Sequence, residues 1–317
     1  MQPRVGIKFD AGFFILMRLK RNQARSVQGE LLAELSSMRV MGKKVLLFFM
    51  ICFCALSALA KDMRIISLAP ATTEILFALG LDKEIVAVSS FCDYPPQALN
   101  KEKAGTFSDP DIEKILSLKP DLIFCTGLKQ AAMVTKLRQL GLRVCISDPA
   151  DFNELFASIK EIAALTGKNH EGEKIITNMS DTIDWVKEQV KRDEHGKPLR
   201  VYVEIWHGPL VTTGRNTFIS KILQIAGAVN IADNCAKSYF DITAEEVLVS
   251  DPQVIIAAYM ANGDARAQLM RRPGWSNVSA VRDSRVYNDI DSNIFLRPGP
   301  RLALGLKEIY KRLYAEK

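Results

Sequence analysis

The sequence predicts an α/β protein with two similar lobes, each with a parallel-type sheet flanked by helices, joined by one long rigid connecting helix. Three observations support this prediction. Short β-branched runs alternate with helical patterns after residue 60, an αβ pattern recurs 132 residues later, and an apolar stripe of helical period lies between the two copies. Strands that alternate with helices are typical of a parallel sheet covered by helices.

The alternation defines a predicted N-terminal lobe over residues 61–168. Glycine or proline follows each predicted helix, as expected where a helix ends. The predicted strands are 64–68, 85–88, 122–124 and 143–146, and the predicted helices are 73–79, 112–118 and 133–140.

The repeat predicts a second lobe of the same plan over residues 196–317. The stretch from Glu113 to Ile123 reads as an acid, a short helix, a proline and a strand, and the stretch from Glu245 to Ile255 repeats this order. A second similarity, between helices that end at Gly80 and at Gly227, occurs in the same order. The distance from this glycine to the repeated acid differs by fifteen residues between the two copies. Chance similarity of common helix stops is the alternative.

Residues 169–195 form the predicted connecting segment. Its apolar residues step by three and four, which is the period of one helical face, at Ile176, Met179, Ile183, Val186 and Val190. A helix from about Glu171 to Arg192 would span roughly 33 Å at 1.5 Å per residue. Such a rod predicts lobes that close little, because a flexible hinge requires Gly- or Ser-rich sequence.

The net charge of +6 lies entirely in residues 1–60, which form a predicted leader. They hold nine basic and three acidic residues, and the rest of the chain holds 33 of each. This removes the electrostatic support for nucleic-acid binding. Residues 41–60 have the basic, apolar and small-residue regions of a signal peptide, which predicts export to the periplasm. An uncleaved membrane anchor is the alternative. Residues 1–40 fit no export signal, and we expect translation to start at Met41 rather than a genuine extension.

The enzyme motifs that are recognisable from sequence are missing. The chain has no dinucleotide, phosphate-loop, nucleophile-elbow or HExxH motif. Its three histidines are too few for a clustered metal site. The four cysteines after residue 60 are predicted to be buried thiols, with one disulfide as an alternative: Cys92, Cys125, Cys145 and Cys235. We expect a binding protein without a metal or cofactor of its own. An exported two-lobe enzyme with its active site between the lobes is the alternative.

Aromatic and polar side chains gather after the predicted strands, where parallel sheets bind ligands. Aromatic rings on both lobes could clamp a bulky ligand, with ordinary interlobe packing as the alternative. The candidate ligand-binding residues are Phe91, Phe107, Trp206, His207, Tyr239, Asn293 and Arg297.

Glu113 and Glu245 occupy matched places in the two copies of the repeat. Asp109 is the predicted N-cap of the first helix, with Pro110 as its first residue, and Thr243 and Glu246 form a predicted capping box on the second. Acids in the first turn are favoured by the helix dipole. This does not explain why matched acids lie on matched elements.

The chain from about Arg64 to Tyr314 resembles the periplasmic cobalamin-binding proteins, within the wider class of helical-backbone receptors for cobalamin, iron-siderophores and haem. The resemblance is carried by RIISLAPATTEILFALGL, FCDYPPQA, IEKILSLKPDLI, GPLVTTG and ITAEEVLVSDPQVII. It implies a monomeric receptor of an ABC importer, with the ligand in an interlobe cleft as cargo. Delivery is to a permease dimer in the inner membrane, driven by a cytoplasmic ATPase. It also implies that Glu113 and Glu245 dock onto permease arginines and that Phe91, Phe107 and Tyr239 line the cleft.

The sequence departs from the cobalamin pattern within that cleft. Phe107 and Tyr239 replace two tryptophans, and Cys125 and Thr126 stand where a third is expected. Trp206 and His207 are additions to the pattern. Cobalamin, an iron-siderophore and haem therefore all stay open as ligands, and His207 or a tyrosine could approach iron in the last two.

Overall fold

A computed structural model describes residues 63–127, 130–192, 196–258 and 265–314 of the 317. The predicted leader lies outside the described residues. No helix in the described ranges is both long and apolar enough to cross a membrane.

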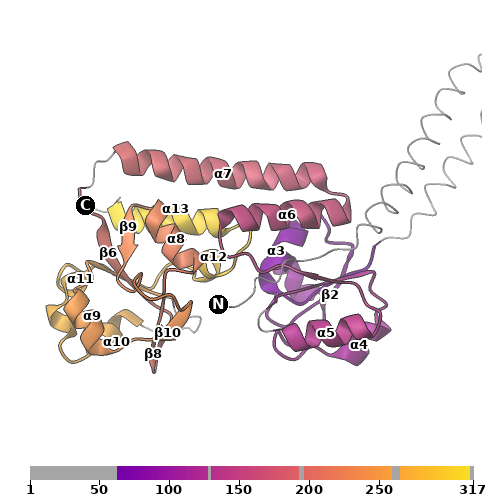
Figure 1. The fold of residues 1–317 in the computed structure, drawn as a ribbon, viewed down its shortest axis with the longest axis horizontal. Coiled ribbons are helices and arrows are strands. Elements are labelled where there is room, and N and C mark those ends of the chain that lie inside the picture. Colours follow the sequence, from indigo (N-terminus) through magenta and orange to yellow (C-terminus); the bar gives the residue numbers. More distant parts are fainter. Residues whose placement is uncertain (1–62, 128–129, 193–195, 259–264, 315–317) are drawn as a thin grey trace, which may run out of the picture. The chain divides into compact units, whose positions relative to one another are not determined.

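The N-terminal lobe is built on a five-stranded parallel sheet in the order β3-β2-β1-β4-β5 (Figure 1). Its strands are β1 (Ile65–Ser67), β2 (Ile85–Val88), β3 (Glu102–Lys103), β4 (Leu122–Cys125) and β5 (Val144–Ile146). Its helices are α3 (Pro70–Ala78), η1 (Pro96–Asn100), α4 (Ile112–Ser117), α5 (Ala131–Gln139) and α6 (Phe152–Thr166). The predicted elements are all present, and α3 begins earlier than predicted because Pro70 fits the first turn of a helix.

The C-terminal lobe has a four-stranded parallel sheet in the order β12-β11-β6-β9 and a small antiparallel sheet. The parallel strands are β6 (Leu199–Glu204), β9 (Ala228–Asn230), β11 (Val254–Ala257) and β12 (Val286–Tyr287), and the antiparallel ones are β7 (Trp206–His207), β8 (Leu210–Thr213) and β10 (Tyr239–Asp241). The helices are α8 (Phe218–Ile225), α9 (Ala244–Ser250), α10 (Ala265–Met270), η2 (Trp275–Asn277), α11 (Ser279–Arg282), α12 (Asn293–Leu296) and α13 (Leu302–Tyr314).

The two parallel sheets share one topology, as the sequence repeat predicts. The order β9-β6-β11-β12 across the second sheet corresponds to the order β2-β1-β4-β5 across the first. The short helices α4 and α9 precede β4 and β11. The segment between β2 and α4 is longer than that between β9 and α9, since it carries η1 and β3. This accounts for most of the fifteen-residue difference in spacing.

The predicted connecting helix is α7 (Asn169–Arg192), which lies across α6 and α13 (Figure 1). Four of the five stripe residues are buried, and Val190 is half-buried. Gly172 permits close packing on α6, because a Cβ at this position would lie 2.6 Å from the Cβ of Ala163. At the other end, Trp185 packs edge-on against Tyr310 of α13, with ring centroids 5.9 Å apart.

The lobes share one hydrophobic core. A single cluster of buried side chains runs from β1 and β4 through α6, α7 and α13 into β6 and β11. Phe152 of α6 meets Phe218 of α8 edge-on, with ring centroids 5.7 Å apart. The two lobes are therefore joined by continuous packing as well as by the connecting helix.

Candidate functional site

Phe91 and Phe107 lie on loops that follow strands of the N-terminal sheet. Phe91 comes three residues after β2 and its side chain is 58% exposed, while Phe107 is half-buried in the loop before α4. An exposed phenylalanine is costly to leave in water without a role. Both positions are at the carboxyl edge of the sheet, as the sequence predicts.

The loop that carries Phe107 is held in a tight turn. Gly105 has a φ of +92°, and a Cβ there would lie 2.4 Å from the amide nitrogen of Asp111, so only glycine fits. Thr106 and Asp109 close the turn with two hydrogen bonds, from Thr106 N to Asp109 O and from Asp109 N to Thr106 Oγ1, each of 3.0 Å. The backbone thus fixes where Phe107 is presented.

Gln130 ties this turn to the sheet and was not identified from the sequence. Its side chain is 2% exposed, and its Nε2 donates to Phe107 O at 2.7 Å and to Leu68 O at 3.1 Å. Its Oε1 accepts from Thr126 N at 2.8 Å. One amide therefore joins the loops after β1 and β4 to the Phe107 turn. A single glutamine before a helix gives no sequence signal for such a role.

The antiparallel sheet of the C-terminal lobe brings Trp206 and Tyr239 onto one face. Trp206 is opposite Val211, which is opposite Asp241, and Tyr239 is opposite Thr213. Because side chains alternate along a strand, these five residues share a face. Trp206 is 42% and Tyr239 is 53% exposed. Figure 1 shows β8 and β10 at the side of this lobe that faces the N-terminal lobe.

His207 belongs to the opposite face of that sheet by register. It is opposite Leu210, which together with Phe240 packs on the second hydrophobic cluster of the lobe. Its side chain is exposed at the tip of the β7–β8 hairpin, with its ring centroid 4.9 Å from that of Trp206. The register thus separates His207 from Tyr239, although the sequence predicts both for one site.

A buried carboxylate supports the corner that leads to Trp206. Glu204 ends β6 with no exposed surface, and its two oxygens accept from Arg272 at 2.6 and 2.7 Å. The Arg272 guanidinium in turn lies 4.6 Å from the ring centroid of Trp275. A buried carboxylate needs such a partner, but its arginine is 68 residues away, so this pair cannot be recognised from the sequence alone.

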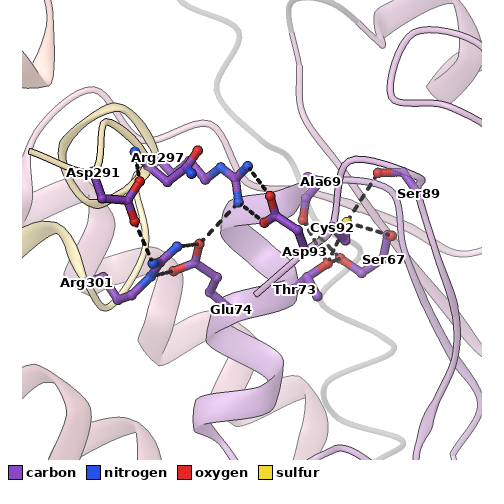
Figure 2. A network of polar contacts seen from close by, with 11 residues as sticks. Ser67, Ala69, Thr73, Glu74, Ser89, Cys92, Asp93, Asp291, Arg297 and Arg301 are labelled. Carbon is purple, nitrogen blue, oxygen red and sulfur yellow. Dashed lines mark hydrogen bonds and ion pairs between the residues drawn. The ribbon is translucent and has the colours of Figure 1, made fainter. Parts of the chain in front are cut away.

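Arg297 lies where the two lobes meet, in a network of ion pairs (Figure 2). Its guanidinium pairs with Asp93 of the N-terminal lobe, with one bond of 3.2 Å, and lies 3.7 Å from Glu74. Arg301 donates to both oxygens of Glu74, at 2.7 and 2.8 Å, and lies 3.5 Å from Asp291. Asn293 is half-buried at the start of α12, where its backbone N donates to Asp291 Oδ1 at 3.0 Å.

The surroundings of this network shift the pKa of two of its carboxyl groups. Burial raises the pKa of the Glu74 carboxyl, and the hydrogen bond and charge of Arg301 oppose this rise. The hydrogen bond from Arg297 is the main cause that lowers the pKa of Asp93. Both carboxylates are thus committed to arginines of the other lobe.

An open pocket of about 410 Å³ adjoins this network. Its walls come from both lobes, with Glu74, Phe77 and Tyr94 on one side and Pro300 and Arg301 on the other. The four exposed or half-buried aromatic candidates at the strand ends do not line it. The pocket beside the ion pairs is therefore distinct from the place where the sequence predicts the aromatic ligand site.

Glu113 and Glu245 are exposed and occupy equivalent positions on α4 and α9. The N-cap of α4 is Asp111, whose side chain accepts from Lys114 N at 3.0 Å, and not Asp109 as predicted. Asp109 instead closes the Phe107 turn. The predicted capping box of Thr243 and Glu246 is confirmed. Each acid is the second helical residue, and Figure 1 shows both helices on the side of their lobe away from α7.

The structure also describes the four cysteines and the residues that could bind a metal ion. Cys92, Cys125, Cys145 and Cys235 are all free thiols there, and the first three are buried. Within the same ranges no three histidine, cysteine or acidic side chains gather as a metal site would require.

Comparisons with known proteins point to one family. Residues 65–292 match the family described as periplasmic binding protein. The chain is 30% identical over 258 residues to an uncharacterised ABC transporter substrate-binding lipoprotein of Bacillus subtilis, with 80% of each chain covered. The crystal structure of the periplasmic vitamin B12-binding protein of Vibrio cholerae has 30% identity and a TM-score of 0.70, over 80% of this chain and 98% of that one.

A further similar structure is named for a different ligand. It is a periplasmic haem-binding protein of Pseudomonas aeruginosa, with 25% identity and a TM-score of 0.72, over 80% of this chain and 93% of that one. These proteins are solute receptors, which favours the receptor over the exported enzyme. With two lobes of one topology, a shared connecting helix and a matching sequence over most of its length, the chain belongs to the periplasmic binding protein family, the substrate-binding components of ABC importers.

Proposed function

We propose that this chain captures cobalamin or a similarly bulky metal chelate, such as haem or an iron-siderophore, and delivers it to a membrane permease. The ligand is cargo and is released unchanged. The chain works as a monomer in the periplasm after export by the signal peptide at 41–60, with an uncleaved leader as an alternative anchor. The similarity to proteins named as vitamin B12-binding and haem-binding supports this class of ligand.

One observation carries the proposal: exposed aromatic side chains are fixed on rigid supports in both lobes. In the C-terminal lobe, Trp206 and Tyr239 share one face of a small sheet. In the N-terminal lobe, the backbone of Phe107 is held by its glycine turn and by Gln130. Phe91 is exposed on the loop after β2, where Ser90 N donates to Gly105 O at 3.0 Å. Rigid aromatic surfaces bind large flat ligands at little cost in conformational entropy.

We assign ligand contact to these four aromatic residues and to His207 and Asn293 at the edges of the site. The register of β7 favours Tyr239 over His207 as the residue nearest a ligand held against Trp206. The sequence also predicts Arg297 for this site, but its guanidinium is paired with Asp93, and we do not assign it to ligand contact.

A titration tests the ligand and the site together. Cyanocobalamin, haemin and a ferric catecholate siderophore are each titrated into the protein and followed by visible absorption, and at least one should bind with one-to-one stoichiometry. Phe107→Ala and Tyr239→Ala should each weaken that binding by about 1–3 kcal/mol, because aromatic surface no longer covers the ligand.

Phe77→Ala is the matched control, since Phe77 lines the pocket beside the ion pairs and not the aromatic site. Its affinity should equal that of the unaltered protein. Unchanged affinity in both site variants, with a loss in Phe77→Ala, would place the ligand in the other pocket and refute the assignment.

We also propose that Glu113 and Glu245 dock onto basic residues of the two permease subunits. Their matched positions at exposed helix starts, on the same side of the two lobes, support this proposal. Charge pairs across such an interface mainly set orientation and the rate of association.

A further inference from the structure

The loop that carries Phe91 is fastened to both lobes. We call residues Ser89–Pro95 the strap, because this segment leaves β2, presents Phe91 and runs to the lobe junction. It begins the longer segment between β2 and α4 that has no counterpart of equal length in the second lobe. Phe91 itself is largely exposed, so its own side chain does little to hold the strap in place.

The first attachment is Cys92, which is fully buried in the N-terminal lobe. Its Sγ accepts from Thr73 Oγ1 at 3.1 Å and lies 3.2 Å from Ser89 Oγ and 3.9 Å from Ser67 O (Figure 2). Its amide donates to Ser89 O at 3.1 Å. The residue directly after Phe91 is thus anchored to β1 and α3.

The second attachment comes from the other lobe. Asp93 pairs with Arg297, and the guanidinium carbon of Arg301 lies 3.6 Å from the ring centroid of Tyr94. Both arginines also reach Glu74, which is buried on α3. Figure 2 shows the resulting chain of contacts from Asp291 and Arg301 through Glu74 and Arg297 to Asp93.

The strap is therefore held at Cys92 by its own lobe and at Asp93 and Tyr94 by arginines of the C-terminal lobe. We propose that Asp93 and Arg297 are positioning residues, which hold Phe91 in place for the ligand and tie its position to the arrangement of the lobes. Arg297 acts through Asp93 and not by contact with the ligand. The part of this inference that concerns affinity rests on the proposed function, whereas the part that concerns the strap does not.

Asp93 gives a cleaner test than Glu74. In Asp93→Asn, Arg297 keeps Glu74 at 3.7 Å as a partner, whereas a change at Glu74, which is 2% exposed, would remove the buried partner that both arginines share. The control is Asp184→Asn, which removes a comparable exposed ion pair with Lys187 on α7. Circular dichroism and thermal unfolding of each variant confirm that it is folded.

The first measurement needs no ligand. Cys92 is alkylated with iodoacetamide in the folded protein, and its peptide is followed by mass spectrometry, with Cys125 as the internal reference. Asp93→Asn and Arg297→Gln should each raise the rate at Cys92 by about tenfold, because a charge-assisted hydrogen bond no longer opposes local opening. The rate at Cys125 should stay constant, as should both rates in Asp184→Asn.

The second measurement uses affinity for whichever of cyanocobalamin and haemin binds in the titration. Asp93→Asn should weaken binding several-fold in the natural background and have no further effect in Phe91→Ala, since its influence passes through that ring. Equal losses in both backgrounds would show that Asp93 does not act through Phe91. An unchanged Cys92 rate in both strap variants would overturn the inference even if neither chelate bound.

Discussion

Burial of the cysteine side chains disfavours their ionised thiolate form in the folded protein. Burial raises the pKa of the Cys125 thiol to about 12 and that of Cys145 to about 11, from an ordinary value of 9.0. The two residues lie on neighbouring strands but in different hydrophobic clusters, Cys125 in one and Cys145 in the other. They are therefore packing residues and not a pair placed to form a disulfide.

These shifts predict a loss of stability in alkali. Above pH 9 the unfolded chain releases the thiol protons while the folded chain retains them, so the unfolded state binds fewer protons and the free energy of unfolding falls as pH rises. The loss should be about 1.4 kcal/mol per thiol for each pH unit until the folded pKa is reached. Urea unfolding at pH 8, 9 and 10 measures it.

Other groups titrate in this range, so the comparison is between variants. Cys125→Ala and Cys145→Ala remove one thiol each, and their stability should fall less steeply between pH 9 and pH 10 than that of the unaltered protein. Equal slopes in all three proteins would contradict burial as the cause of the raised pKa values.

At the residue scale, sequence reasoning found the exposed aromatic side chains but not what holds them. Strand ends followed by Phe91 or Trp206, and a helix start preceded by Tyr239, can be recognised locally. The partners that fix such loops come from distant parts of the chain, as Glu74 and Arg301 are 227 residues apart. A single sequence records the residue types of such a pair without its proximity, so Gln130 and Glu204 gave no signal.

At the scale of elements, α4 and α9 carry the docking proposal. Both are short helices whose first turn is capped by a side chain, Asp111 in one and Thr243 in the other. In each helix the cap side chain accepts from the third helical amide, Lys114 N in α4 and Glu246 N in α9. Glu113 and Glu245 are therefore not needed as caps, which agrees with the docking that we propose for them.

Charge reversal separates docking from folding. Glu113→Lys combined with Glu245→Lys should abolish uptake of the ligand by cells that express the cognate permease, and each single change should lose part of it. Ligand affinity should be unchanged, and the free energy of unfolding should fall by only about 1–2 kcal/mol, from two unfavourable helix-dipole interactions. Uptake of radiolabelled ligand and calorimetry measure the two effects.

Asp181→Lys with Glu188→Lys makes the same change of charge on exposed positions of α7, and this control should transport normally. Transport that survives the double reversal at 113 and 245 would reduce both acids to ordinary residues at helix starts.

Element types were predictable because their signals are local. Alternating hydrophobic runs, glycine stops and the stripe of α7 each depend on a few neighbouring residues. The error at the start of α4 has a local cause as well. Asp109 and Pro110 read as a cap and a first helical residue, but the glycine turn at Gly105 uses Asp109 to present Phe107, and the helix begins two residues later.

At the scale of the whole molecule, three features oppose a hinge. The connecting helix α7 is continuous over 24 residues, the hydrophobic core runs through both lobes, and ion pairs cross the junction at Glu74 and Asp93. Opening the lobes would expose apolar surface and separate Glu74, whose carboxylate is buried, from both arginines, and each change is unfavourable. We therefore expect the ligand to enter its proposed site without a large movement of the lobes.

The most direct test of this account is small-angle X-ray scattering of the protein, free and saturated with the chelate that binds, cyanocobalamin in the first instance. The account predicts a radius of gyration that does not change on binding, beyond the added mass of the ligand. A clear compaction on binding, as in receptors that close about a hinge, would show that the walls of the site come together only with the ligand and would contradict the account.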